Sequence, residues 1–165
     1  MKRTGLIVVA DVMTPDPVCV HPETPIAQAM EMFDRHDFNA LPVVNADRTL
    51  TGIVTKLDLL RVIRPDLAFH VPEPDAVAAL PVRKIMRTSV VNVEAEDALT
   101  VAMELMVSTR LRSLPVIRRG GGAPQLIGIV TQGDVMRAFR TQLLGGVAPD
   151  QETPELLRQA STARV

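Results

Sequence analysis

Apolar and polar positions follow the same succession of periods twice along the 165-residue chain. Alternation at 18–20 and at 91–93 predicts short, half-buried strands, because successive strand side chains point to opposite faces. Two further apolar runs then predict strand pairs, at 41–44 with 49–55 and at 114–117 with 125–131. Helical spacing of apolar residues between and after these strands indicates two helices in each copy. The pattern therefore predicts a β-α-β-β-α unit that occurs twice.

The predicted helices are defined by their apolar positions. In the first helix of each copy these are Ile26, Ala29, Met30 and Phe33, then Leu99, Ala102, Met103 and Met106. In the second helix they are Leu57, Leu60, Val62 and Ile63, then Val135, Met136, Phe139 and Leu143. Thr24 and Asp97 precede the first helices and are expected to cap them. The segments 45–48 and 118–124 carry turn residues and are expected to close the two hairpins.

Sequence identity between the copies establishes a duplication. Residues 12–44 match residues 85–117 at an offset of 73, with ten identities in 33 positions. After three extra residues in a glycine-rich loop the offset becomes 76, and six of ten positions from Gly52 to Arg61 are identical to their counterparts. The predicted organisation is a first repeat at 1–64, a proline-rich linker at 65–82 and a second repeat at 83–142. A polar tail follows at 143–165, and the linker is expected to hold a helical turn near 75–80.

Composition excludes several classes of function. With 18 basic and 19 acidic residues the chain lacks the basic excess that nucleic-acid binding normally needs. No apolar run reaches the length that spans a membrane, so no membrane role is predicted. The single cysteine, Cys19, allows no internal disulfide and fits a reducing compartment, so we expect a cytoplasmic protein.

The segments Gly52-Ile53-Val54-Thr55-Lys56-Leu57-Asp58 and Gly128-Ile129-Val130-Thr131-Gln132-Gly133-Asp134 resemble the CBS domain. Val12-Met13-Thr14-Pro15 and Leu41-Pro42-Val43-Val44 upstream strengthen the resemblance, which extends over both copies. It implies an α+β, sandwich-like fold in which tandem β-α-β-β-α repeats are related by a pseudo-two-fold axis that leaves two clefts. It also implies that the clefts bind an adenosine-containing ligand such as AMP, ADP, ATP or S-adenosylmethionine, and that the chain forms a homodimer through its helices.

The motif Thr-x-x-Asp has two compatible interpretations at 55–58 and 131–134. Thr followed three residues later by an acidic side chain is a helix capping box. In CBS domains similar residues bind a ribose and its phosphate, which a helix N-terminus supports by offering backbone donors. Thr55, Asp58, Thr131 and Asp134 are therefore candidate ligand-binding residues.

The resemblance adds further candidates around the same clefts. They are Val18, Cys19, Asn39, Ala40, Pro42, Val91, Asn92, Arg112, Ser113 and Pro115. Asn39-Ala40 and Arg112-Ser113 stand where many nucleotide-binding relatives carry His-Arg, and this departure argues against tight triphosphate binding. Cys19 is interpreted as a small buried hydrophobic residue in preference to a redox switch.

No catalytic or metal-binding constellation is apparent in the sequence. The three histidines, at 21, 36 and 70, lack ligand spacing with cysteines or carboxylates, and no nucleophile-base pair stands out. The favoured hypothesis is a regulatory sensor that is not an enzyme, has no cofactor and acts on a partner protein through its ligand. The alternative is a structural dimerisation or docking module without nucleotide binding.

Overall fold

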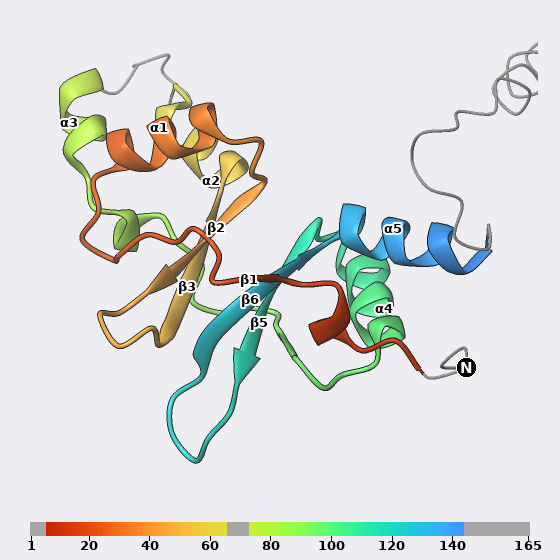
Figure 1. Cartoon of the computed structure of the whole chain (residues 1–165). Coiled ribbons are helices and arrows are strands. Elements are labelled where there is room, and N and C mark those ends of the chain that lie inside the picture. The colour runs from red at the N-terminus through yellow and green to blue at the C-terminus, as the bar shows by residue number, and fades with distance from the viewer. Residues whose placement is uncertain (1–5, 66–72, 144–165) are drawn as a thin grey trace, which may run out of the picture. The chain divides into compact units, whose positions relative to one another are not determined.

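The computed structural model describes residues 6–65 and 73–143. In chain order the elements are β1 (Thr14–Pro15), α1 (Ile26–Arg35), β2 (Ala40–Val44), β3 (Leu50–Thr55), α2 (Lys56–Ile63), α3 (Pro74–Ala79), β4 (Val93–Glu94), α4 (Leu99–Thr109), β5 (Ser113–Arg118), β6 (Gln125–Thr131) and α5 (Gln132–Leu143) (Figure 1). Short 3-10 turns precede each copy at Val9–Asp11 and Val82–Lys84. The described chain up to Val135 forms one compact unit, to which the contacts below belong, and Met136 begins a second.

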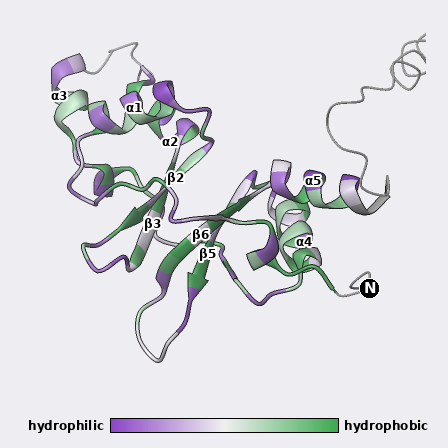
Figure 2. Cartoon of the chain, viewed as in Figure 1, coloured by the Kyte–Doolittle hydropathy of each residue, from purple (hydrophilic) through white to green (hydrophobic). Residues whose placement is uncertain are grey.

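Each copy contains the predicted antiparallel hairpin. β2 pairs with β3, and β5 pairs with β6. The first turn is closed with Arg48 at a φ of 67° and the second with Gly121 at a φ of 74°, a conformation that tight hairpin turns commonly require. Figure 2 shows the strands as mostly hydrophobic and the hairpin ends as more hydrophilic. Alternate residues of β3 and β6 are buried, as expected for strands with one face in the core.

A short segment of each copy joins the hairpin of the other copy. β1 of the first copy pairs antiparallel with β6, with Thr14 opposite Ile129. In return, Arg87 of the second copy bridges Ile53 in β3, with backbone hydrogen bonds of 2.9 Å in both directions. The copies are therefore tied together by a reciprocal exchange of the segments that precede their first helices.

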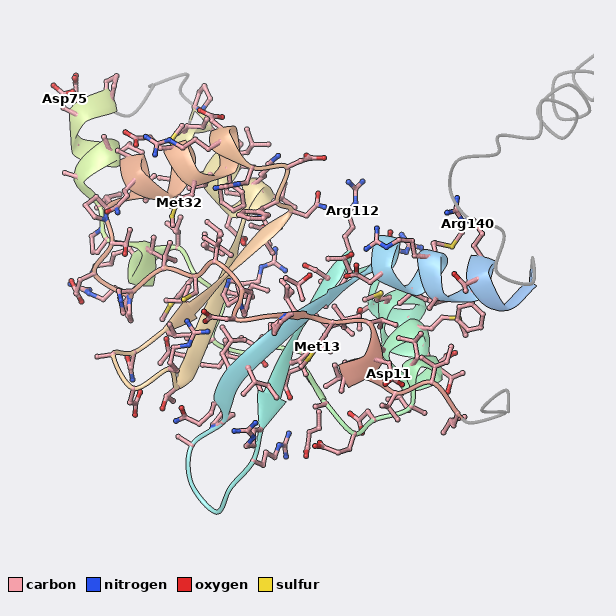
Figure 3. The ribbon with its side chains drawn as sticks, viewed as in Figure 1. Asp11, Met13, Met32, Asp75, Arg112 and Arg140 are labelled. Carbon is pink, nitrogen blue, oxygen red and sulfur yellow. The ribbon has the colours of Figure 1, made fainter. Side chains whose placement is uncertain are left out.

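Two equivalent glycines make this exchange possible. A Cβ atom on Gly52 would lie 2.7 Å from Met86 Sδ and 2.9 Å from the carbonyl oxygen of Arg87. A Cβ atom on Gly128 would lie 2.6 Å from Met13 Sδ, and Figure 3 labels Met13 beside this hairpin. The glycine of each Gly-Ile-Val-Thr segment is thus required by the close approach of the exchanged strand.

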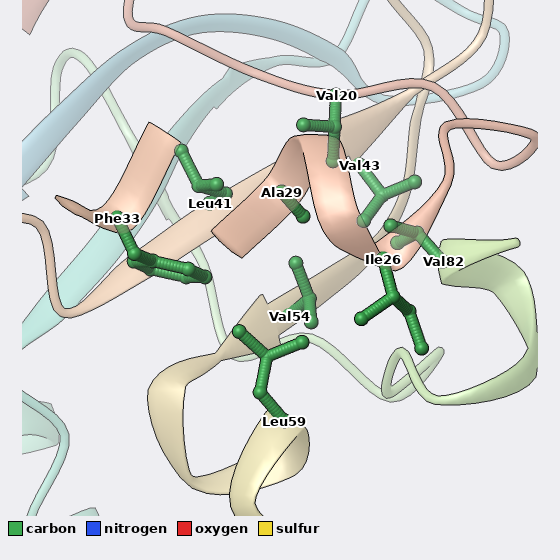
Figure 4. Close-up of a cluster of buried hydrophobic side chains, with 9 residues drawn as sticks. All are labelled: Val20, Ile26, Ala29, Phe33, Leu41, Val43, Val54, Leu59 and Val82. Carbon is green, nitrogen blue, oxygen red and sulfur yellow. The ribbon is translucent and has the colours of Figure 1, made fainter. Parts of the chain in front are cut away.

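The core of the first copy also draws on the exchange. Its buried cluster consists of Val20, Ile26, Ala29, Phe33, Leu41, Val43, Val54, Leu59 and Val82 (Figure 4). Val82 is the last residue of the predicted linker, yet it is fully buried in this cluster. A second cluster of Val44, Leu50, Ile117 and Leu126 joins the ends of the two hairpins. Each fully buried side chain of this kind contributes about 1.5–3 kcal/mol relative to an exposed one.

The predicted first strand of each copy is shorter than its apolar alternation indicates. Only Val20 forms a bridge in the first copy, to Val43, and the corresponding strand of the second copy is Val93–Glu94. The prediction at 18–20 and 91–93 was therefore wrong in extent. The reason is that Val20 is the residue whose backbone exchanges hydrogen bonds with β2, whereas Val18 is 40% exposed.

The predicted caps of the first helices were also wrong. α1 begins after Pro25 and α4 after Ala98, neither with a side-chain cap. Thr24 Oγ1 instead accepts a hydrogen bond from the backbone N–H of His21, and Asp97 accepts one from Glu94. These polar side chains close the turn before the helix, an alternative that short polar residues offer to the backbone.

The second helix of the first copy packs on the core through only one of its predicted apolar positions, Val62. Leu59 and Asp58 are buried in α2, whereas Leu57, Leu60 and Ile63 are 52%, 57% and 41% exposed. The apolar positions of the first helices fit better: Ile26, Ala29, Phe33, Leu99, Ala102 and Met106 are buried, and Met30 and Met103 are not. The helical turn predicted in the linker is confirmed as α3, and the tail beyond 143 lies outside the described residues.

Candidate functional site

Two cavities lie beside the exchanged segments. The larger, which we call the Thr55 cavity, has a volume of about 630 Å³. Its lining comes from the β3–α2 junction, the segment before β4, the α4–β5 connection and the residues before β2, namely Ile53, 55–57, 87, 89–91, 109–113, Asn39 and Ala40. This volume falls within the range of roughly 300–1,000 Å³ that is usual for small-molecule sites.

The smaller cavity, which we call the Thr131 cavity, has a volume of about 240 Å³. It is lined by equivalent parts of the repeat, namely Thr14, 16–18, 37–40, Ser113, Ile129 and Thr131. Asn39, Ala40 and Ser113 line both cavities, so the two share a wall. The duplicated chain therefore forms two related hollows, as expected from its internal symmetry.

The Thr-x-x-Asp motif of the first copy forms a complete capping box. Asp58 Oδ2 accepts hydrogen bonds from the backbone N–H of Thr55 at 3.0 Å and from Thr55 Oγ1 at 2.6 Å. The backbone N–H of Asp58 in turn donates to Thr55 Oγ1 at 3.2 Å. Thr131 and Asp134 repeat this arrangement with distances of 2.8, 2.7 and 3.2 Å. The capping interpretation of both motifs is confirmed.

The second oxygen of Asp58 carries two ionic contacts. Asp58 Oδ1 lies 3.1 Å from Arg61 Nη1 and 3.1 Å from Arg87 Nε, while the Asp58 side chain is only 3% exposed. Arg87 belongs to the exchanged segment, and its side chain is 44% exposed. A ligand in the Thr55 cavity therefore meets the arginine and Thr55 before it meets the carboxylate.

The position before β2 and its counterpart before β5 contact each other. Arg112 Nη1 donates a hydrogen bond to Asn39 Oδ1 at 3.4 Å, and these residues are equivalent at the offset of 73. Figure 3 shows the Arg112 side chain extending away from the start of β5. The shared wall of the two cavities is thus formed by equivalent but chemically different residues.

A sequence model of the CBS domain matches residues 9–65 and 82–141, which is most of the chain. The chain belongs to the CBS domain family. The tandem repeats and the α+β fold predicted from the sequence are thereby confirmed.

Several curated and solved proteins are similar to this CBS pair. It is 28% identical to the CBS domain-containing protein CBSX1 of Arabidopsis thaliana, over 82% of this chain and 65% of that protein. The crystal structure of CBSX2 in complex with AMP is 31% identical, with a TM-score of 0.69, and covers 82% of this chain and 98% of that one. A second structure of CBSX2, from Arabidopsis thaliana, has a TM-score of 0.71 and 29% identity over 87% of this chain and 100% of that one.

Enzymes with CBS domains are also related to this chain. The inosine-5'-monophosphate dehydrogenase of Thermoplasma acidophilum is 31% identical over 82% of this chain, but the match spans only 23% of that enzyme. Similarity to this CBS pair therefore covers about a quarter of the enzyme.

The predicted site residues of the CBS pair divide into two groups. Thr55, Asn39, Ala40, Val91, Arg112 and Ser113 line the Thr55 cavity, and Val18, Asn39, Ala40, Ser113 and Thr131 line the Thr131 cavity. Asp58, Asp134, Cys19, Pro42, Asn92 and Pro115 lie outside both linings. The structure brings the first group together, whereas it does not place the second group in either lining.

Cys19 and Asn92 illustrate the second group. Cys19 packs against the cluster at the hairpin ends, and Arg48 Nη1 lies 3.5 Å from its sulfur. Burial raises the pKa of the Cys19 thiol, an effect that the positive charge of Arg48 partly offsets. Asn92 turns back to its own segment, where its Nδ2 donates to the carbonyl oxygen of Val90 at 2.9 Å.

Several lining residues were missed at the level of sequence, among them Arg87, Ser89 and Arg110. Arg87 and Ser89 precede β4 and carry no motif, and Arg110 is the C-cap of α4, where it adopts a left-handed φ of 59°. Repeat alignment could have found Arg87 and Ser89, because their counterparts Thr14 and Asp16 also precede a strand. To place these residues in the cavity, one must also know that the segment before the first helix of each copy pairs with the hairpin of the other copy.

Neither a metal-binding cluster nor a membrane-spanning helix occurs among the described residues. Across 6–65 and 73–143, His, Cys, Asp and Glu form no group of three or more that could hold a metal ion. None of the helices in the same part of the chain has the length and apolar character needed to cross a membrane.

Proposed function

We propose that this CBS pair is a regulatory module that binds an adenosine-containing ligand. The observation that carries the proposal is the Thr55 cavity, because its 630 Å³ are lined by the Thr of a helix N-terminus, by Val90 and Val91 and by several arginines. A helix N-terminus and arginine side chains suit a phosphate, while the valines suit an apolar base. The complex of CBSX2 with AMP supports the same ligand class.

Under this proposal Asp58 anchors the ribose by way of its second oxygen. Asp58 Oδ2 is fully used by the capping box, so a ribose hydroxyl reaches Oδ1 when Arg87 moves aside. Such a movement is feasible because Arg87 is 44% exposed and its pairing with Asp58 spans two segments. Displacement of Arg87 gives the ligand a direct way to change the contact between the two copies.

Titration calorimetry with AMP, ADP, ATP and S-adenosylmethionine tests the proposal. A hydrogen bond to a charged group is worth about 1.5–3 kcal/mol, so Asp58→Ala should weaken binding on the order of 10- to 100-fold. Asp75→Ala, on the exposed first turn of α3, is the matched control and should leave affinity unchanged. Unchanged affinity in both Asp58→Ala and Asp134→Ala would contradict the ribose role.

A homodimer is the second part of the proposal. α2 exposes Leu57, Leu60 and Ile63, which recur at a spacing of three and so lie along one side of the helix. Apolar side chains gathered in this way favour burial against another copy of the chain. Analytical ultracentrifugation should find a dimer for the native chain and a monomer for Leu60→Glu, whereas a native monomer would contradict the proposal.

The alternative function is a structural dimerisation or docking module whose cavities bind no nucleotide. The buried, fully hydrogen-bonded Asp58 favours it, since the carboxylate already has its partners. Thermal unfolding separates the two functions, because a ligand at 100 times its Kd adds about 2.7 kcal/mol to stability. A shift with any of the four adenosine ligands supports the sensor, and the absence of all shifts supports the structural module.

The proposal assigns the chain no catalysis and no cofactor. The adenosine ligand is regulatory and changes the activity of a protein partner. A cytoplasmic location follows from the single cysteine and its expected reduced state.

A further inference from the structure

The walls of the two cavities correspond position by position. The offset of 73 relates residues 14–40 to residues 87–113, and the offset of 76 relates residues 53–56 to residues 129–132. Each cavity takes its walls from the same parts of the repeat, with the roles of the copies reversed. Two equivalent residues therefore occupy the same place in the walls of the two cavities, and a difference between them is a chemical difference between the cavities.

The charged residues differ most. Lys56, Arg87, Arg110 and Arg112 line the Thr55 cavity, and its described lining contains no acidic residue. Their counterparts are Gln132, Thr14, Asp37 and Asn39. Asp16 and Asp37 line the Thr131 cavity, and no basic residue is among the described residues that form its lining. One cavity is thus lined with positive charge and the other with negative charge.

Ion pairs neutralise these linings only in part. Asp16 Oδ1, in the lining of the Thr131 cavity, lies 2.7 Å from Arg48 Nη2, and Arg87 Nε, in the lining of the Thr55 cavity, lies 3.1 Å from Asp58 Oδ1. Lys56 Nζ lies 3.8 Å from Asp37 Oδ1, a long contact between side chains that are 47% and 106% exposed, and such pairs are weak. Arg112 contacts the neutral amide of Asn39. The Thr55 cavity consequently keeps the positive character that a phosphate group requires, in the arginine form that suits phosphate geometry.

We propose that the two cavities differ in ligand class: an adenosine ligand that bears phosphates enters the Thr55 cavity alone. The Thr131 cavity is smaller, at about 240 Å³ against 630 Å³, and the weakly paired carboxylate of Asp37 in its lining repels a phosphate chain. The inference rests on the proposed function, since it assigns the ligand of that function to one of two equivalent sites. It also explains how the module works without the His-Arg pair.

Paired titrations with ATP and with uncharged adenosine test the assignment. The native chain should bind one ATP per chain. Arg110→Asp, which installs the residue of the other copy, should weaken ATP binding by about 10-fold or more and change adenosine binding by less than about 2-fold. Arg119→Asp is the control of equal charge change, because Arg119 lies in the hairpin loop and lines neither cavity.

The reverse variant converts the second cavity. Asp16→Ser with Asp37→Arg gives it the residues that the second copy carries at the equivalent positions, Ser89 and Arg110, and should raise the stoichiometry to two ATP per chain. Two equal ATP sites in the native chain, or an equal loss of ATP and adenosine binding in Arg110→Asp, would overturn the inference while leaving the proposed function intact. Failure of the native chain to bind either compound would overturn the proposed function itself.

Discussion

Gly52 and Gly128 occupy equivalent places under the exchanged strands. A Cβ atom on Gly52 would lie 2.7 Å from Met86 Sδ, and a Cβ atom on Gly128 would lie 2.6 Å from Met13 Sδ. At the cavity rims, by contrast, equivalent positions exchange arginine for threonine or aspartate. The two glycines lie where the segment of one copy packs on the hairpin of the other, so any added side chain there disturbs packed backbone. The positions at the cavity rims face solvent, where substitution costs little stability. Duplication thus preserved the framework and left the two cavities able to acquire different chemistry.

The largest expected effect comes from filling the space under an exchanged strand. Gly52→Ala places a Cβ atom 2.7 Å from Met86 Sδ and 2.9 Å from a backbone oxygen, so the free energy of unfolding should fall by about 1–3 kcal/mol. Gly128→Ala should cost less, because a flexible Met side chain is the closest neighbour at both sites but the nearest backbone oxygen lies at 3.2 Å from the Gly128 Cβ position, against 2.9 Å at Gly52. Urea unfolding of both variants measures the difference.

Gly122→Ala is the control for this pair, since a Cβ atom there meets nothing within 4 Å. Equal stability of Gly52→Ala and Gly122→Ala would show that the exchanged strand tolerates displacement. Substitutions at the two glycines and at the cavity rims would then cost similar amounts of stability, contrary to the difference inferred between them.

The next largest effect is expected at Arg87, a cavity-rim residue that also contacts the buried Asp58. Arg87→Thr installs the residue of the other copy and removes one of the two arginines on buried Asp58. Because Arg87 is 44% exposed, the solvent-screened loss should be about 0.5–1 kcal/mol and should shrink in high salt. Thermal unfolding at two salt concentrations measures it.

Arg83→Thr is a matched control, because Arg83 is equally exposed but its partner Glu23 is 72% exposed. Its effect should be smaller than that of Arg87→Thr. A larger effect at Arg83 would mean that burial of the carboxylate does not strengthen the Asp58 pair.

The sequence predicted the elements that depend on local pattern. The hairpins, the buried positions of α1 and α4 and the two capping boxes follow from periodicity and from side chains three residues apart. The function of Thr24 was misjudged because the same side chain can cap a helix or close the turn before it. Local pattern offers no basis for choosing between these two uses.

The exchange of strands could not be predicted in this way. β1 and β6 lie more than a hundred residues apart, and both copies offer β1 a Gly-Ile-Val-Thr strand with the same pattern. Arg87 was missed as a consequence, because its place beside Asp58 exists only when the segment crosses to the other copy. The site was therefore predicted where one segment forms it and missed where two segments meet.

The smallest expected effect lies at Cys19, whose counterpart is Asn92. Burial raises the pKa of the Cys19 thiol and Arg48 lowers it, so alkylation should set in at a higher pH than for an exposed cysteine. Arg48→Ala removes the attraction to the thiolate and releases Asp16 from its 2.7 Å ion pair, and both changes push the pKa of Cys19 further upward. Mass spectrometry of iodoacetamide labelling against pH should therefore show the onset moving up in Arg48→Ala and staying in place in Arg119→Ala. A downward movement would mean that the variant exposes the thiol, and that Arg48 holds the hairpin ends over Cys19 as part of the framework.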